Sequence, residues 1–175
     1  MNVTLIGMPG SGKSVVGVLL AKRMNLGFVD GDLVIQQNQG ELLKDILSEK
    51  GFDEFERIEN AANLSITQPD TVIAPGGSII YCPEAMEHFK KMGPVVYLKI
   101  SLEELTKRLG NLTERGVALH AGQTLKDLYE ERVPLYESYA DLSVDEDGLT
   151  VGETMQAVFN ALAASKVFTK EEFMV

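Results

Sequence analysis

The chain has 175 residues, 45% of them hydrophobic, and a formal net charge of −10 at pH 7. This length suits one domain with a full core, no apolar run approaches the roughly 20 residues that cross a bilayer, and so acidic a chain offers no basic face for nucleic acid. A single cysteine excludes a disulfide framework and a multi-cysteine metal site, and we expect a cytoplasmic protein without a signal peptide.

Apolar, strand-like runs alternate with helical patterns along the chain, which is typical of βαβ units and a parallel sheet. Residues 3–6 predict a buried strand, and the residues after a glycine-rich loop at 7–14 are apolar at helical spacing. Further strands are predicted over 26–29, 71–74, 95–100 and 142–144, and helices over 33–39, 41–50, 52–67, 83–91, 101–110, 124–139 and 151–164. We therefore predict a three-layer α/β/α fold around a five-stranded parallel sheet.

Three segments depart from this alternation. Residues 111–123 are polar, glycine-punctuated and weakly periodic, and they lie between two predicted helices, so we expect a mobile lid there. Pro134 predicts a kink in the helix over 124–139, or the end of its first part. Residues 166–175 mix charged and aromatic side chains and are expected to form a C-terminal tail, so the predicted domain covers residues 1–165.

The loop at residues 7–14 fits G-x-x-x-x-G-K-[ST], the pattern of a phosphate-binding loop (P-loop), at every specified position. Its flanks, a strand and a helix, favour this interpretation over an unrelated glycine-rich turn, because backbone N–H groups and the positive helix end then bind one anion together. Lys13 is expected to reach the β- and γ-phosphates of ATP, and the Ser14 hydroxyl to ligate Mg²⁺. The residues expected to bind ATP here are Gly10, Ser11, Gly12, Lys13, Ser14 and Val15.

Two further motifs follow predicted strands, at the edge where open parallel sheets bind ligands. Asp30 and Asp32 are one residue apart, so one carboxylate can face Mg²⁺ while the other accepts the proton of an attacking hydroxyl. The alternative for this pair is a solvated turn with an aspartate that caps a helix. Gly76 and Gly77 end the next strand and allow close backbone approach to a ligand, unless they form only a tight turn.

Taken together, these stretches resemble the shikimate kinases over about residues 2–162. The resemblance is carried by the ordered segments GMPGSGKS, FVDGD, FERIE, the glycine pair, RGV at the start of the expected lid, and ERVPLY in the helix behind it. It implies a P-loop kinase fold, and an enzyme that uses ATP and Mg²⁺ to phosphorylate a hydroxyl of a small carboxylate, which in this family is shikimate. It also implies substrate-binding helices over about residues 31–67.

On the donor side, the resemblance implies that Asp30 assists Mg²⁺ together with Ser14. Arg115 would close over the phosphates from the lid, and Arg108 would lie against the adenine. From spacing alone, a single arginine such as Arg115 or Arg132 is more often an ordinary surface residue. The residues expected to take part directly in catalysis are Lys13, Asp32 and Arg115.

On the acceptor side, the resemblance implies that Asp32 binds the acceptor hydroxyls and acts as the base, or next to it. Arg132 would hold the acceptor carboxylate, and Gly76 and Gly77 would line the pocket with backbone N–H groups. Ser78 follows this pair where the family usually has a third glycine, and the expected lid is short and lacks the usual Arg-Pro.

One departure from the family pattern concerns the acceptor carboxylate. The family usually has Phe-Arg where this chain has Phe55-Glu56, and that arginine is the second clamp on shikimate. Arg57 does not substitute, because neighbours on a helix point about 100° apart. A charge-assisted hydrogen bond is worth roughly 1.5–3 kcal/mol, and a facing carboxylate adds repulsion. Shikimate in the family pose would therefore lose on the order of a hundredfold or more in affinity.

We hypothesise that the pocket takes a zwitterion such as homoserine, with Arg132 on its carboxylate, Glu56 on its ammonium group and Asp32 on its hydroxyl. The competing interpretation is that Glu56 turns to solvent and shikimate still binds. The residues expected to bind the acceptor are Asp32, Glu56, Gly76, Gly77, Ser78 and Arg132.

Three other functions are weighed against this one. Gluconate kinases share a P-loop and an Asp-Gly-Asp run, but FERIE and ERVPLY resemble the shikimate kinases better. Nucleoside monophosphate kinases need several arginines for a second phosphate cluster, and the expected lid offers few. A nucleotide-dependent switch without catalysis is the third. We expect a small-molecule partner, no nucleic acid or membrane partner, and a monomer or weak homodimer.

Overall fold

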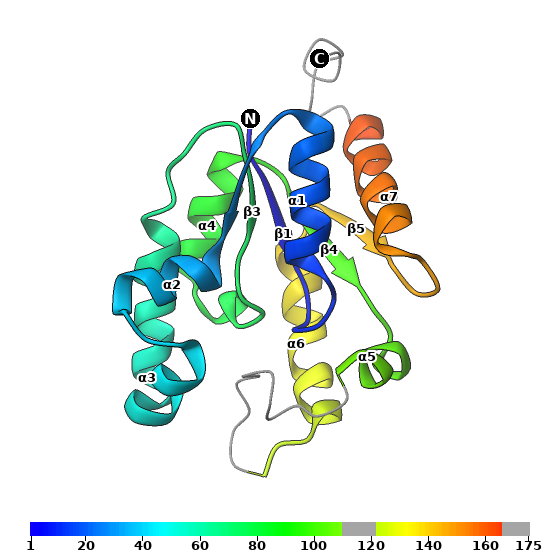
Figure 1. Cartoon of the computed structure of the whole chain (residues 1–175). Helices are drawn as coiled ribbons and strands as arrows, with labels where there is room; N and C mark the ends of the chain where they lie inside the picture. Colours follow the sequence, from blue (N-terminus) through cyan, green and yellow to red (C-terminus); the bar gives the residue numbers. More distant parts are fainter. Residues whose placement is uncertain (110–121, 166–175) are drawn as a thin grey trace.

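The computed structural model describes residues 1–109 and 122–165, and it has the predicted α/β/α layers (Figure 1). Five parallel strands form one sheet in the order β2-β3-β1-β4-β5. Their bounds are β1 Val3–Ile6, β2 Gly27–Asp30, β3 Thr71–Ala74, β4 Val95–Lys99 and β5 Leu142–Asp145. Each predicted strand is present, with its ends moved by one residue at most.

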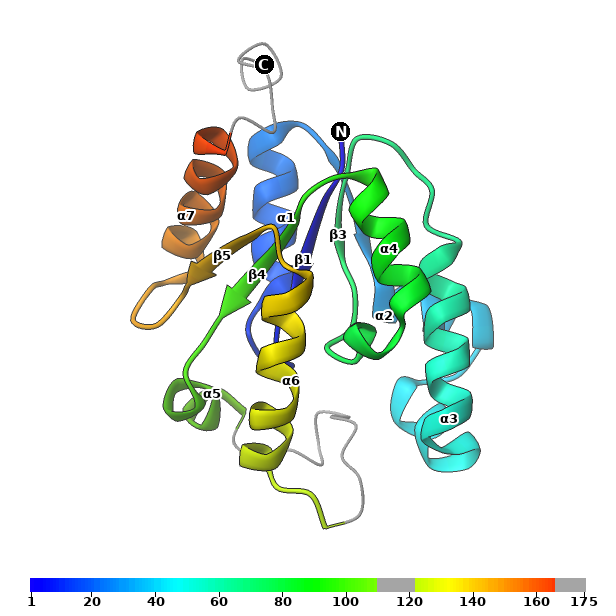
Figure 2. The same cartoon turned by 180° about the vertical axis from the view of Figure 1, so that it is seen from behind.

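Helices cover both faces of the sheet, as Figures 1 and 2 show from opposite sides. The bounds are α1 Lys13–Met24, α2 Gly31–Gln39, α3 Leu43–Leu64, the 3₁₀-helix η1 Ile79–Tyr81, α4 Pro83–Met92, α5 Leu102–Leu109, α6 Leu125–Tyr139 and α7 Val151–Ala164. Helices α1 and α7 lie side by side on one face, and α4 and α6 lie on the other. Among the described residues, no helix has the length and apolar character needed to cross a membrane.

The central strands form because their residues are apolar on both faces. Every residue of β1 and β3 is buried, as expected for parallel strands that helices cover on both sides. One core cluster joins these strands to α1 and α7 through Val16, Leu20 and Val158. A second lies under α4 and α6, where the rings of Tyr97 and Tyr136 stack with their centroids 5.2 Å apart.

Three local predictions can be compared with the structure. Helices break at Gly40 (φ 71°) and Gly51 (φ 77°), as the glycines predicted, because both residues take the left-handed conformation that glycine tolerates best. Of the two outcomes predicted for Pro134, a kink or an end to the first part of the helix, the end does not occur, because α6 continues through Pro134. The lid expected over 111–123 falls largely outside the described residues, as does the expected tail at 166–175.

The carboxyl ends of all five strands lie at one edge of the sheet. The P-loop follows β1, Asp30 ends β2, the Pro75–Gly77 turn follows β3, and Glu146 follows β5. This shared edge brings together groups that are far apart in the sequence, and it is where open α/β sheets bind ligands.

Candidate active site

The P-loop forms a tight turn that opens α1. Gly10 (φ 86°) and Gly12 (φ 84°) both have left-handed backbone, and the Ser11 N–H donates to the Met8 carbonyl at 3.1 Å. Gly12 is the N-cap of α1 and has no capping side chain, so amide groups of the first helical turn lack an internal partner. These amides and the helix dipole favour an anion at this point.

Lys13 lies across the P-loop with its amino group turned inward. Its Nζ donates to the carbonyls of Gly7 (2.9 Å) and Met8 (3.0 Å). Burial lowers the Lys13 pKa to about 8, although Asp32 and Glu146 act in the opposite direction. A buried ammonium group with a depressed pKa fits a site for a phosphate chain, because a bound anion favours the charged form.

Ser14 and Asp30 form a pair of oxygen donors beside the loop. The Ser14 hydroxyl donates to Asp30 Oδ2 at 2.6 Å, while Asp30 Oδ1 accepts from the backbone N–H groups of Asp32 and Leu33. Asp30 therefore caps α2 with one oxygen and faces Ser14 with the other, so the cap and the metal-site interpretations are compatible. A hydroxyl and a carboxylate are hard oxygen ligands, which fits Mg²⁺ with its remaining positions on water and phosphate.

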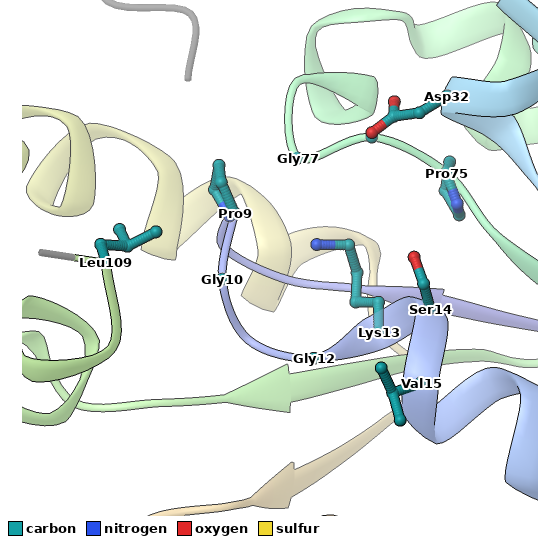
Figure 3. A pocket seen from close by; sticks show the side chains of 11 residues that line it. Pro9, Gly10, Gly12, Lys13, Ser14, Val15, Asp32, Pro75, Gly77 and Leu109 are labelled. Carbon is teal, nitrogen blue, oxygen red and sulfur yellow. The ribbon is translucent and has the colours of Figure 1, made fainter. Parts of the chain in front are cut away.

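Asp32 and Lys13 line the same cavity, of about 280 Å³, which also contains Ser14 and the Gly76–Gly77 turn (Figure 3). Burial and the neighbouring Asp30 raise the Asp32 pKa to about 6, against the opposing effect of Lys13. The aspartate is therefore a stronger proton acceptor than an exposed one and still ionised at neutral pH.

The glycine pair is required by close packing rather than by its backbone angles. A Cβ atom at Gly76 would lie 2.6 Å from Asp32 Oδ1, and one at Gly77 would lie 2.8 Å from the Pro9 ring. The pair thus lets the β3 loop approach both the aspartate and the P-loop. The Tyr136 hydroxyl holds this loop from α6 by donating to the Gly77 carbonyl at 2.6 Å.

A second pocket begins at Ser78, next to the first cavity, and Glu56 and Arg132 line it. Arg132 is only 2% exposed, and its guanidinium carbon lies 5.3 Å from the centre of the Tyr81 ring. Arg57 does not reach this pocket, since its side chain is 79% exposed and pairs with Glu54 at 3.3 Å. The structure thus brings Glu56, and not its basic neighbour, to the same pocket as Arg132.

Glu59 is a residue of this region that the sequence reasoning did not single out. Its Oε2 accepts from the Ser78 hydroxyl at 2.6 Å, and its Oε1 has no hydrogen-bond partner among the described residues. Burial raises the Glu59 pKa to about 7 despite that hydrogen bond, and the Asp32 and Glu56 charges add to the rise. Glu59 lies four residues after the apolar Phe55, and residues at this spacing share a helix face. The sequence therefore contained a signal that Glu59 faces the protein interior.

A third cavity, of about 390 Å³, is lined by the P-loop residues Gly10, Ser11 and Gly12. Arg108 and Glu146 also line it. Glu146 was not predicted as a site residue either. It follows β5, at the same edge of the sheet where Asp30 and Asp32 were predicted to act. Arg115, expected to close over the phosphates, lies outside the described residues. The other predicted site residues line these three cavities, except Asp30, which contacts the cavity residue Ser14.

The parallel sheet, the P-loop and an aspartate in the same cavity define the class of P-loop phosphotransferases. Comparison with known proteins gives the family. The family model of shikimate kinase matches residues 9–163. Shikimate kinases of Thermodesulfovibrio yellowstonii (36% identity over 160 residues) and Sulfurihydrogenibium sp. (32% over 162) align with 90% and 92% of this chain, and with 92% and 97% of their own lengths.

A solved structure agrees with these relatives. Shikimate kinase from Acinetobacter baumannii in complex with shikimate superposes with a TM-score of 0.87 at 27% identity, and the alignment covers 95% of each chain. The chain belongs to the shikimate kinase family, and it is an ATP-dependent small-molecule kinase.

Proposed function

We propose that the chain transfers the γ-phosphoryl group of MgATP to an alcohol hydroxyl of a small carboxylate, which by family membership is shikimate. The observation that carries this proposal is the single cavity that Lys13 and Asp32 share at the P-loop. An acceptor hydroxyl beside Asp32 then lies within the same space as the terminal phosphate beside Lys13.

The transfer is an in-line displacement at the γ-phosphorus. The acceptor oxygen forms the new P–O bond, the bond to the β–γ bridging oxygen breaks, and ADP leaves. Asp32 takes the hydroxyl proton, helped by its raised pKa. Lys13 neutralises charge on the phosphates, as Arg115 would from the lid. Ser14 and Asp30 would hold Mg²⁺, which supplies further neutralisation of the phosphate oxygens.

A hydroxy amino acid such as homoserine is a second candidate acceptor, because the charges around Arg132 favour it. Glu56 lines the pocket beside Arg132, and the buried Glu59 lies close to both Asp32 and Glu56. A shikimate carboxylate bound to Arg132 would thus lie beside the acidic Glu56, where a second cation would be needed to bind it. An ammonium group beside Glu56 is matched to this arrangement, whereas a second carboxylate oxygen is not.

The two candidates are separated by measuring ADP release with MgATP and a panel of shikimate, homoserine, serine and threonine. We expect transfer to at least one alcohol, and its loss in Lys13→Ala. Faster turnover of shikimate than of any amino acid would rule out the second candidate. ATP binding without transfer to any member, or an active Lys13→Ala variant, would contradict the kinase proposal and favour a non-catalytic nucleotide-binding switch.

The variant Glu56→Arg reverses the charge at this position and is measured in the same assay. It restores the family residue, so we expect at least a tenfold gain in kcat/KM for shikimate and a loss for homoserine. Glu54→Arg adds the same charge on the outward face of the same helix, and it should change neither value by more than about twofold.

A further inference from the structure

The first and third cavities lie on two sides of the P-loop. Both are lined by Gly10 and Gly12, but Asp32 and the glycine pair line only the first. A triphosphate bound on the loop with its terminal phosphate toward Asp32 therefore has its nucleoside end in the third cavity. That cavity is also bordered by the first turn of α7, at Val151 and Thr154.

Arg108 is the only cationic side chain among the described residues that line this third cavity. Two carboxylates hold it: its Nε donates to Glu104 Oε1 at 3.1 Å, and its Nη1 donates to Glu146 Oε1 at 3.0 Å. The partners differ in burial, since the Glu104 side chain is 31% exposed and that of Glu146 only 2%. Exposed pairs on a helix contribute little, whereas a buried charge-assisted hydrogen bond fixes geometry.

Glu146 is itself anchored to the sheet. Its backbone N–H donates to the Lys99 carbonyl at 2.9 Å, directly at the ends of β4 and β5. Its carboxylate therefore connects a rigid element to α5, the short helix that carries Arg108. The two residues are 38 positions apart in sequence, so this pair connects α5 to the sheet, whereas the Glu104–Arg108 pair lies within α5.

We propose that Glu146 is a positioning residue for the nucleotide: its buried carboxylate fixes the Arg108 guanidinium where the nucleoside of ATP packs against it. Glu146 acts through Arg108 and does not contact the phosphates. This inference rests on the ATP-binding part of the proposed function, and it is independent of which acceptor is used.

The decisive experiment compares ATP with inorganic tripolyphosphate, which has the phosphates but no nucleoside. Binding of each to the full chain is measured by calorimetry in the presence of Mg²⁺. Glu146→Gln keeps the shape of the side chain and removes its charge. We expect about tenfold weaker ATP binding, unchanged tripolyphosphate binding, a raised KM for ATP, and a kcat within threefold of the wild type.

Coupling between the two residues is tested with Arg108→Ala and the double variant. We expect the double variant to bind ATP no more weakly than Arg108→Ala alone, because Glu146 acts on the nucleoside through Arg108. Glu103→Gln, on the same helix in an exposed pair with Lys107, is the matched control and should bind ATP like the wild type. Equal losses for ATP and tripolyphosphate, or additive losses in the double variant, would overturn the proposal.

A pH titration adds a readout that a purely structural role would not move. Burial raises the Glu146 pKa to about 7, with Arg108 and Lys13 opposing the rise and Asp147 adding to it. ATP affinity of the wild type should therefore weaken as the pH falls below 7 and the carboxylate is neutralised, while Glu146→Gln should lack that component. A wild-type chain that binds ATP but phosphorylates no alcohol would contradict the kinase proposal and leave this inference intact. One that does not bind ATP would end both.

Discussion

At the scale of single residues, the site is marked by carboxyl groups kept away from water. Asp32, Glu59 and Glu146 all have a raised pKa, and burial is the largest cause for each. A carboxylate whose pKa is higher in the folded state than in the unfolded chain destabilises the fold once it is ionised. Such groups are retained at functional sites more often than elsewhere.

Glu59 gives a direct test of this cost. Its pKa rises from 4.5 to about 7 on folding, so the folded state binds the extra proton between these values and stability falls as the pH rises through them. The full effect is on the order of 3 kcal/mol. We expect Glu59→Gln to be more stable than the wild type at pH 8 and to lose this advantage at pH 5, as measured by urea unfolding.

Glutamine at this position can still accept from the Ser78 hydroxyl, so the comparison isolates the charge. Glu54→Gln, an exposed carboxylate on the same helix, is the matched control and should show no such pH dependence. An equal stability difference at pH 5 and pH 8 would show that the Glu59 charge is not the cause.

Residues of the P-loop and the Asp30–Asp32 pair could be placed from the sequence, because their positions follow from a local motif and from the ends of predicted strands. Glu59 and Glu146 could not be assigned in the same way. Their partners lie 19 and 38 residues away, at Ser78 and Arg108, and only the folded sheet brings them together. Whether Glu56 faces Arg132 likewise depended on the rotation of α3 about its axis.

At the scale of elements, helix ends decide how the site is held. Helix α6 carries Arg132 and Tyr136, and it begins with a complete capping box in which Thr124 and Asp127 exchange hydrogen bonds. Its internal Pro134 removes one backbone bond, yet the helix continues, because Tyr136 is buried against the sheet and fixes the second half. Tertiary packing here outweighs the local tendency of proline to end a helix, so that one of the two outcomes predicted for Pro134 does not occur.

Removal of the Thr124 cap should loosen this helix at the end distant from Tyr136. We expect Thr124→Ala to reduce the free energy of unfolding by about 1 kcal/mol, or about 2–4 °C in Tm for a chain of this size. Thr106→Ala is the control, since within the described part of the chain the Thr106 hydroxyl donates to the Leu102 carbonyl of its own helix, α5. Thermal melts in which both variants behave alike would contradict the capping role.

At the scale of the whole molecule, the five-stranded parallel sheet and the alternation of strands and helices could be predicted, because apolar runs alternate with helical patterns along the chain. The adjoining cavities could not, since each is formed by residues from three or more parts of the chain. Ligands should therefore couple these parts and stabilise the folded state as a unit.

MgATP gives the corresponding global prediction. At a hundred times its Kd, a ligand that binds only the folded state adds about 2.7 kcal/mol, which is about 5–10 °C in Tm for this size. Omitting Mg²⁺ should reduce the shift, and Asp30→Asn, which keeps a good α2 cap, should abolish the difference between the two conditions. Identical shifts with and without Mg²⁺ in the wild type would argue against the Ser14–Asp30 metal site.

The shared wall between the first and third cavities has a consequence for inhibitor design. Gly10 and Gly12 border both spaces, so the two cavities meet at the P-loop. A tethered compound, with a purine at one terminus and a hydroxyl-bearing acceptor mimic at the other, would occupy both compartments through a short phosphate-like bridge. Joining the two halves converts the second association into an intramolecular event, so such bisubstrate mimics should gain potency that neither fragment has alone.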